Sequence, residues 1–223
     1  MTTPSARPPA QRHQQAPQSS QPSQSSRPRQ SETLSASPAS GPVRGVAQMA
    51  MFAALVAVLG QPFAIPVIAG VPITLQTLGV MLAGAILGPW RGAGSMVLLH
   101  VLVAAGLPLL SHGSGGLGVY AGPTAGFALG FIPGAFVVGL LTQLRWPLAW
   151  WRTALGVVVG GMLVIYACGV PVMAFQLGLT LPQALTASAA FLPGDLAKAA
   201  LAVGITHALA KAYPAPFTWA RSR

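Results

Sequence analysis

The chain has 223 residues, of which 53% are hydrophobic and 6% are charged, whereas about 25% of residues are charged in an ordinary soluble domain. This composition excludes a soluble globular protein and indicates that a lipid bilayer surrounds much of the chain. The formal net charge is +10, but the basic residues are not gathered among aromatic or polar neighbours as nucleic-acid binding requires, so we expect no nucleic-acid partner.

The first 44 residues differ in composition from the rest of the chain. Ser, Pro, Gln and Arg dominate residues 1–44, and aromatic residues are absent from them. Such a segment cannot bury enough apolar surface to offset the entropy lost on ordering. We therefore expect a disordered tail over residues 1–44, with only weak attraction for anionic lipid.

Long apolar stretches separated by short Pro- and Gly-marked breaks follow the tail. They lack the alternating pattern of a membrane β-barrel, and about 20 apolar residues cross a bilayer as a helix. We expect an all-α, polytopic membrane domain over residues 45–213, followed by a short basic end over 214–223. The six predicted membrane-spanning helices cover about 45–60, 73–88, 92–110, 121–143, 153–175 and 193–212.

The Lys and Arg residues predict the orientation of this bundle. Eleven of the twelve lie in the tail, in the loops after the second and fourth spans, or at the C-terminal end, and none lies in the opposite loops, about 61–72, 111–120 and 176–192. Positive charge near span ends is retained on the cytoplasmic side. We therefore expect both termini to be cytoplasmic, in a multi-pass protein of the cell membrane.

Alanines at fourfold spacing occur in the first span, as the pairs Ala50 with Ala54 and Ala53 with Ala57. Small residues at this spacing let another helix approach closely. The partner helix can belong to this chain or to a separate membrane subunit, and the spacing does not distinguish the two.

Polar side chains gather where the second span begins. Thr74, Gln76 and Thr77 stand at its predicted outer end, where they either point inward to a ligand or bond neighbouring helices. The loop 111–120 is rich in glycine, including Gly115, Gly116 and Gly118. Glycines allow close backbone approach, so this loop either closes over a pocket or only connects two spans.

One acid and one base fall inside the sixth span. Asp195 and Lys198 are three residues apart, on one helix face, in the stretch Phe191-Leu-Pro-Gly-Asp-Leu-Ala-Lys198. A charge well inside a bilayer costs about 2.5 to 3.5 kcal/mol on insertion scales, so such residues normally face protein or a water-filled cavity. They form either a self-satisfied ion pair or a site for a small anionic ligand.

Six separate motifs follow one another along the chain. They are Val71-Pro-Ile-Thr-Leu-Gln-Thr-Leu-Gly-Val, Ala83-Gly-Ala-Ile-Leu-Gly-Pro, Ala104-Ala-Gly-Leu-Pro, Gly115-Gly-Leu-Gly-Val, Gly122-Pro-Thr-Ala-Gly-Phe and Phe191-Leu-Pro-Gly-Asp-Leu-Ala-Lys. Together, in this order, they resemble the BioY family, the biotin-specific substrate-binding subunits of energy-coupling factor (ECF) transporters. The resemblance covers about residues 46–212.

The resemblance implies biotin capture from outside the cell, and association with a transmembrane coupling subunit and two ATPase subunits. Asp195 would accept a hydrogen bond from the ureido group, while Lys198 would balance the carboxylate or fix Asp195, and the two roles are exchangeable. The lid and wall residues would be Gly115, Gly116, Gly118, Tyr120 and Thr124, joined by Gln76. The first-span alanines, Ala50, Ala53, Ala54 and Ala57, would dock on the coupling subunit.

This chain departs from the family pattern at two wall positions, with Ala125 where a second glycine is common and Phe127 where Tyr is common. It has no G-x-x-x-x-G-K-[ST] loop for ATP phosphates, so the partner ATPases would supply the energy and this chain would need no cofactor. We expect neither a metal site nor catalytic residues.

Other functions also fit parts of the sequence. A related subunit for another small vitamin is the nearest alternative. In a different class, an intramembrane hydrolase would use Ser114 as nucleophile, with His207 as the possible base. A passive membrane scaffold would leave Asp195 and Lys198 unexplained.

Overall fold

The computed structural model describes residues 41–61 and 74–217. The predicted tail therefore lies almost wholly outside the described residues, as do the predicted loop at about 61–72 and residues 218–223 of the C-terminal end. The described residues form helices and no strands, which confirms the all-α prediction.

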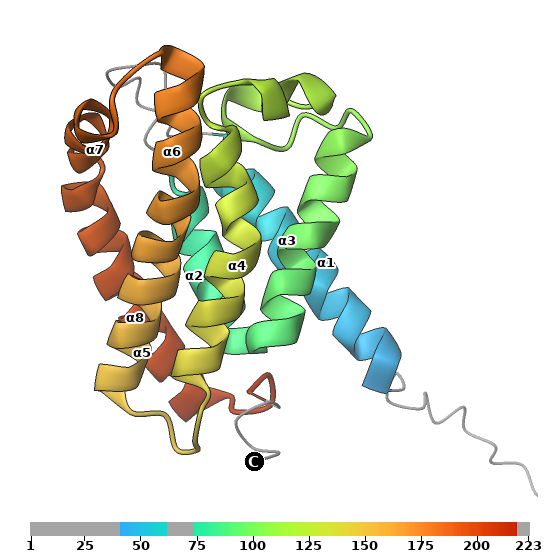
Figure 1. Cartoon of the computed structure of the whole chain (residues 1–223). Coiled ribbons are helices and arrows are strands. Elements are labelled where there is room, and N and C mark those ends of the chain that lie inside the picture. The colour runs from blue at the N-terminus through green and yellow to red at the C-terminus, as the bar shows by residue number, and fades with distance from the viewer. Residues whose placement is uncertain (1–40, 62–73, 218–223) are drawn as a thin grey trace, which may run out of the picture. The chain divides into compact units, whose positions relative to one another are not determined.

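Each predicted span corresponds to a helical segment, with boundaries shifted by a few residues (Figure 1). The helices are α1 (Gly41–Leu59), α2 (Gln76–Leu87), α3 (Pro89–Ala104), α4 (Ala125–Thr142), α5 (Trp150–Val158), α6 (Ile165–Leu177), α7 (Leu181–Ala189) and α8 (Leu192–Ala212). A π-helical segment, η4 (Val159–Val164), joins α5 to α6, so that Trp150–Leu177 is one continuous helix of 28 residues. Two short 3₁₀ turns, η2 (Ser111–Gly113) and η3 (Leu117–Ala121), connect α3 to α4.

Length and hydropathy identify fewer spans among the described residues than the sequence predicts. Two helices are long and apolar enough to cross a membrane, Ala125–Thr142 and Trp150–Leu177. A third is added if α7 and α8, bent by 57° at their junction, count as one span. The other apolar helices are shorter, so the count of six stays a prediction.

Helix α4 packs against α2, α3, α5 and α6. Glycines make these contacts close: a Cβ at Gly84 of α2 would overlap the Ala135 carbonyl, and one at Gly126 of α4 would overlap the Cys168 carbonyl. Without a hydrophobic driving force between helices in lipid, close backbone approach of this kind supplies much of the packing energy.

Helix α7 departs from the predicted loop over 176–192. It begins at a capping box, in which the Gln183 side chain accepts a hydrogen bond from the Thr180 N–H at 2.9 Å. The sequence contains the Thr-x-x-Gln spacing typical of this cap. The helix that follows it is too short to be predicted as a membrane span.

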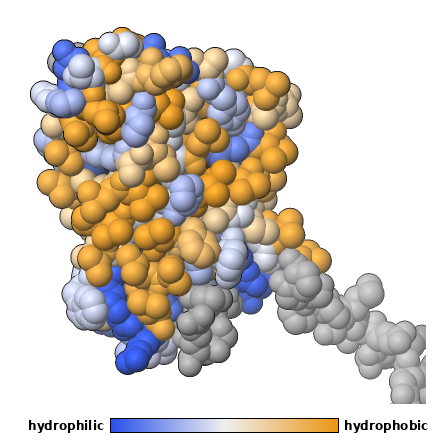
Figure 2. Space-filling model, viewed as in Figure 1, coloured by the Kyte–Doolittle hydropathy of each residue, from blue (hydrophilic) through white to orange (hydrophobic). Residues whose placement is uncertain are grey.

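Apolar side chains form a band across the middle of the face shown in Figure 2, with hydrophilic surface above and below it. Large apolar side chains that the described helices leave exposed include Val101, Leu163 and Leu201, which are 59%, 59% and 52% exposed. Exposed apolar surface of this extent is expected of a protein that faces lipid.

Candidate functional site

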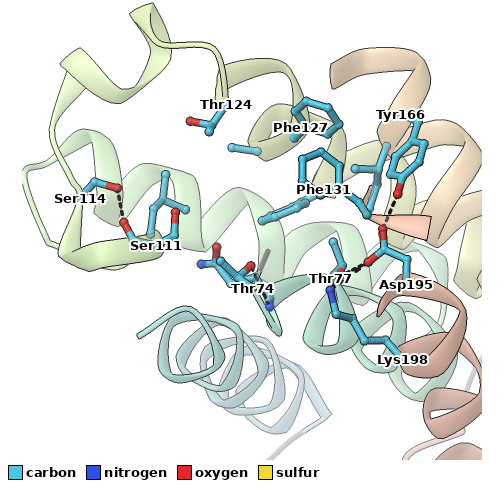
Figure 3. Close-up of a pocket in the computed structure, with 15 residues that line it drawn as sticks. Thr74, Thr77, Ser111, Ser114, Thr124, Phe127, Phe131, Tyr166, Asp195 and Lys198 are labelled. Atoms are coloured by element: carbon cyan, nitrogen blue, oxygen red, sulfur yellow. Dashed lines mark hydrogen bonds and ion pairs between the residues drawn. The ribbon is translucent and has the colours of Figure 1, made fainter. Parts of the chain in front are cut away.

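A pocket opens among α2, α4, α6, the start of α8 and the α3–α4 loop (Figure 3). Its empty volume, including the open mouth, is about 670 Å³. The lining residues are Thr74, Gln76, Thr77, Leu110, Ser111, Ser114, Thr124, Phe127, Ala128, Phe131, Ile165, Tyr166, Phe191, Asp195 and Lys198.

Asp195 and Lys198 form a buried ion pair at one side of the pocket. The Lys198 Nζ lies 2.9 Å from Asp195 Oδ1, and the two side chains are 8% and 4% exposed, respectively. Pro193 occupies the first turn of α8 and Asp195 lies in the same turn, where the positive end of the helix dipole favours a carboxylate.

Two further hydroxyls complete the hydrogen bonding of Asp195. Tyr166 donates to Oδ2 at 2.6 Å, and Thr77 donates to Oδ1 at 3.2 Å. Lys198 in turn donates to the Thr77 oxygen at 3.1 Å. A carboxylate offers about four acceptor sites, so these three donors leave about one site of Asp195 for a ligand.

Aromatic rings form the middle of the pocket. Phe127 lies edge-on to both Tyr166 and Phe191, with ring centroids 6.1 and 6.2 Å apart. In Figure 3 the rings of Phe127 and Phe131 lie between the charged pair on one side and the hydroxyls of the loop on the other. The pocket thus has two polar sides and an apolar centre.

The α3–α4 loop supplies the second polar side. Ser111 and Ser114 line the pocket, and the Ser114 hydroxyl donates to the Ser111 carbonyl at 2.8 Å. Gln76, which also lines the pocket, donates to the Leu109 carbonyl at 3.3 Å and so ties the loop to α2.

Comparison with known proteins adds independent evidence. A family profile described as "BioY family" matches residues 27–215. The chain belongs to the BioY family. It is 44% identical over 184 residues, or 77% of this chain, to a biotin transporter BioY of Rhodobacter capsulatus, of which 95% is covered. It is 32% identical over 173 residues, or 76% of this chain, to a biotin transporter BioY of Lactococcus lactis, of which 92% is covered.

A solved BioY-like structure has the same fold. The crystal structure of the S-component for biotin from an ECF-type ABC transporter matches with a TM-score of 0.71 and 30% identity, covering 76% of this chain and 92% of that one. The family resemblance expected from the motifs is therefore confirmed.

The structure brings four of the residues predicted from the BioY pattern to the pocket: Asp195, Lys198, Gln76 and Thr124. Their segments are far apart in the chain, and Thr77 and Asp195, which bond directly, are separated by 118 positions.

Four other predicted wall residues do not line the pocket: Gly115, Gly116, Gly118 and Tyr120. Gly115 and Gly116 shape the loop instead. The Gly116 N–H donates to the Val103 carbonyl at 2.8 Å, and its φ of 79° suits glycine. A Cβ at Gly115 would overlap the Leu107 carbonyl.

Tyr120 forms a hydrogen bond with a histidine and does not line the pocket. Its hydroxyl lies 2.9 Å from His100 Nδ1, while His100 Nε2 lies 2.8 Å from the Ala128 carbonyl. Because a carbonyl only accepts, Nε2 must carry the proton, and Nδ1 then accepts from Tyr120. No pattern in the sequence predicts this pairing.

The aromatic residues Phe131, Tyr166 and Phe191 line the pocket but were not among the predicted site residues. Phe191 begins one of the six motifs, and Tyr166 carries a hydroxyl within an apolar stretch. Neither feature by itself predicts a pocket residue, because a single aromatic residue in a membrane helix more often faces lipid or a neighbouring helix.

The two residues of the alternative hydrolase do not meet. Ser114 lines the pocket beside the α3–α4 loop. His207 bonds Thr153 at 3.1 Å and stacks on Trp150, near the start of α5. This structure therefore does not support a Ser114–His207 nucleophile and base.

The alanine pairs of α1 are divided between two faces. Ala53 and Ala57 are buried, at 3% and 7% exposure, within the hydrophobic core. Ala50 and Ala54 are exposed. In this conformation Ala50 and Ala54 can contact another subunit, whereas Ala53 and Ala57 pack inside this chain.

Proposed function

We propose that this chain is the biotin-binding S subunit of an ECF-type transporter in the cell membrane, a transport protein rather than an enzyme. The observation that carries the proposal is the buried Asp195–Lys198 pair in a two-sided pocket, in a chain of the BioY family.

Biotin has the same distribution of chemistry as this pocket. Its ureido group offers two N–H donors and one carbonyl, its fused rings are apolar, and its valerate chain ends in a carboxylate. We infer that Asp195 accepts one ureido N–H at its remaining acceptor site. Lys198, which bonds both Asp195 and Thr77, holds the carboxylate of Asp195 in place.

The valerate carboxylate then lies at the loop side of the pocket, near Ser111 and Ser114. The Ser111 hydroxyl and the second N–H of the Gln76 amide, whose first N–H bonds the Leu109 carbonyl, are donors suited to an anion. Phe127 and Phe131 cover the apolar rings of biotin between the two polar sides. The alternative is the exchanged orientation, in which the biotin carboxylate contacts Lys198. Mutations at the two polar sides of the pocket distinguish these two orientations.

The proposed setting is a six-span membrane domain with both termini cytoplasmic. Basic residues at the starts of α3 and α5 support this orientation: Arg91 contacts Gln48 near the start of α1 at 3.3 Å, and Arg152 lies in the first turns of α5. The start of α8, whose Asp195 and Lys198 line the pocket, lies at the opposite end of the bundle (Figure 1). That arrangement opens the pocket to the outside.

Transport requires partners that this chain lacks. A transmembrane coupling subunit would dock on the exposed Ala50 and Ala54 of α1, since small residues let a second helix approach. Two ATPase subunits would bind and hydrolyse ATP on the cytoplasmic side. This chain supplies the substrate pocket and no cofactor.

Calorimetric titration of biotin into the detergent-purified chain tests the proposal. We expect saturable binding that is weakened about 10- to 100-fold in Asp195→Asn and Lys198→Met, since hydrogen bonds to charged groups contribute about 1.5 to 3 kcal/mol. Lys211→Gln removes an equal charge from the exposed end of α8 and should bind as the wild type. A folded wild type that does not bind biotin contradicts the assignment, and titration with other small vitamins then tests the nearest alternative.

A further inference from the structure

A second cavity is lined by residues of the connection between α4 and α5, which lies at the end of the helix bundle away from the start of α8 (Figure 1). It shares no residue with the biotin pocket. Its lining residues are Leu144, Arg145, Ala149, Trp151 and Arg152. Two guanidinium groups and an indole in one open cavity point to an anionic ligand with an apolar part.

No carboxylate side chain within the described parts of the chain balances these guanidinium groups. Arg152 donates to the Pro147 carbonyl at 3.3 Å, and its guanidinium carbon lies 5.8 Å from the centre of the Trp151 ring. Asp195, the only described acidic residue, lies twelve positions before His207 on α8. Since His207 contacts the start of α5, about 18 Å of helix separates Asp195 from this end.

The start of α5 adds to the attraction for an anion. This helix has no acidic residue in its first turn and no side-chain cap, and Ala149, which precedes it, lines the cavity. The positive end of the helix dipole and the first N–H groups therefore adjoin the same space as Arg145 and Arg152.

The surroundings of the cavity match the surface of a membrane. Trp150 and Trp151 are 60% and 67% exposed, and Leu155, one turn further along α5, is 46% exposed. Exposed indoles are typical of the headgroup level of a bilayer, and apolar residues next to them face acyl chains. A free phosphate ion would make no use of this apolar surface.

We propose that this cavity binds the headgroup phosphate of an anionic phospholipid, with Arg145 and Arg152 as its donors and Trp151 beside the glycerol region. The lipid would hold the α4–α5 connection at the cytoplasmic surface. This inference rests on the proposed membrane orientation but is independent of the substrate, because the cavity and the biotin pocket are separate.

Native mass spectrometry of the full chain in detergent, with dioleoyl-phosphatidylglycerol and dioleoyl-phosphatidylcholine as competing probes, tests the proposal. We expect wild-type protein to retain phosphatidylglycerol preferentially. Arg145→Gln with Arg152→Gln should lower that preference at least about tenfold, as expected for the loss of charged hydrogen bonds. Lys211→Gln removes one charge from the same end outside the cavity and should keep the preference, as should Arg145→Lys with Arg152→Lys in large part.

Several outcomes would overturn this lipid site. Equal retention of the two lipids by the wild type would show that the cavity does not select an anionic headgroup. An equal loss in Lys211→Gln and in the arginine variant shows general attraction between the basic end and anionic lipid. Competition by millimolar inorganic phosphate as strong as by the lipid assigns the cavity to free phosphate. Biotin titration of the same preparation tests the proposed function separately, and the helical circular dichroism signal verifies that each variant is folded.

Discussion

At the residue scale, the buried charges of the pocket are tolerated because each has partners. Asp195 accepts from Lys198, Thr77 and Tyr166, and an unpaired charge at this depth would be strongly destabilising. The same bonds orient the carboxylate before a ligand arrives, which lowers the entropy lost on binding. Tyr166 makes the shortest of these contacts, at 2.6 Å.

Tyr166→Phe removes that donor while keeping the ring beside Phe127. We expect biotin affinity to fall about tenfold, because Asp195 then loses its orientation and one charged hydrogen bond. Calorimetry measures the change, and the thermal midpoint of the unliganded variant verifies its fold. A tighter complex would instead show that Tyr166 competes with the ligand for Asp195.

The contact between Tyr120 and His100 acts on the loop beside the pocket. Burial raises the pKa of the Tyr120 hydroxyl above its usual value, so the hydroxyl stays protonated and donates to His100 Nδ1 at neutral pH. The loop thereby gains a fixed point next to α3, close to where Ser111 and Ser114 line the pocket.

Tyr120→Phe should therefore loosen this loop without removing a pocket residue. We expect faster amide hydrogen exchange over residues 111–121 in the unliganded protein, and faster biotin dissociation with a smaller change in equilibrium affinity. Phe217, which is buried near Trp146 at the other end, lies in a segment whose exchange should be unchanged. Wild-type exchange rates in the loop of the variant would contradict a fastening role for Tyr120.

At the scale of helices, the fit between α4 and α6 determines the width of the pocket. Gly169 of α6 lies directly against the Phe127 ring, and a Cβ at this position would overlap it. A strained core contact of this kind typically costs about 1 to 3 kcal/mol when the neighbour cannot move. The cavity that Phe127 lines offers the ring space into which it can shift.

Gly169→Ala should thus weaken biotin binding by at least about tenfold and lower the thermal midpoint. The matched control is Gly204→Ala, because a Cβ at Gly204 of α8 meets nothing within 4 Å. Alanine should stabilise that helix by up to about 1 kcal/mol. If the two variants bind biotin equally well, Gly169 does not set the pocket width.

The exposed face of helix α1 is the proposed contact with the coupling subunit. Ala54→Phe places a large ring on the surface proposed for the coupling subunit, whereas Leu201→Phe enlarges an exposed residue of α8, 52% accessible. We expect Ala54→Phe to abolish uptake of labelled biotin by the assembled transporter and to leave binding by the isolated chain intact. Normal uptake in Ala54→Phe, or equal loss in Leu201→Phe, would remove α1 as the docking surface.

At the scale of the whole molecule, the pocket is built from the helices and loops of the membrane domain. Its lining residues fall between Thr74 and Lys198. Residues 1–40, which carry four of the arginines, lie outside the described residues, and their composition predicts a tail without a folded site. Binding should therefore not depend on them.

A chain lacking residues 2–40 should bind biotin with the affinity of the full chain, as measured by the same calorimetric titration. The physical reason is that the pocket residues hold one another through direct bonds, such as those of Asp195. A large loss of affinity in the shortened chain would assign the tail a part in binding.

Features that depend on local pattern could be predicted from the sequence. Apolar stretches of membrane length predicted where the helices lie, because helix formation and burial in lipid depend on neighbouring residues. Asp195 and Lys198 were identifiable because charge is costly in that setting. Their motif, with five others in order, was enough to identify the family. The capping box at Thr180 is an equally local feature, but the short helix that it begins is not predicted by a search for long apolar stretches.

Which residues share the pocket, and which support it, depends on the packing of the helices in three dimensions. Tyr166 meets Asp195, Tyr120 meets His100 instead of the pocket, and Ala53 turns inward while Ala54 faces out. These outcomes depend on the rotation and depth of each helix against its neighbours, and the π-helical segment before α6 alters that rotation by adding residues to a turn. Close packing between distant segments sets these quantities, so no local pattern in the chain records them.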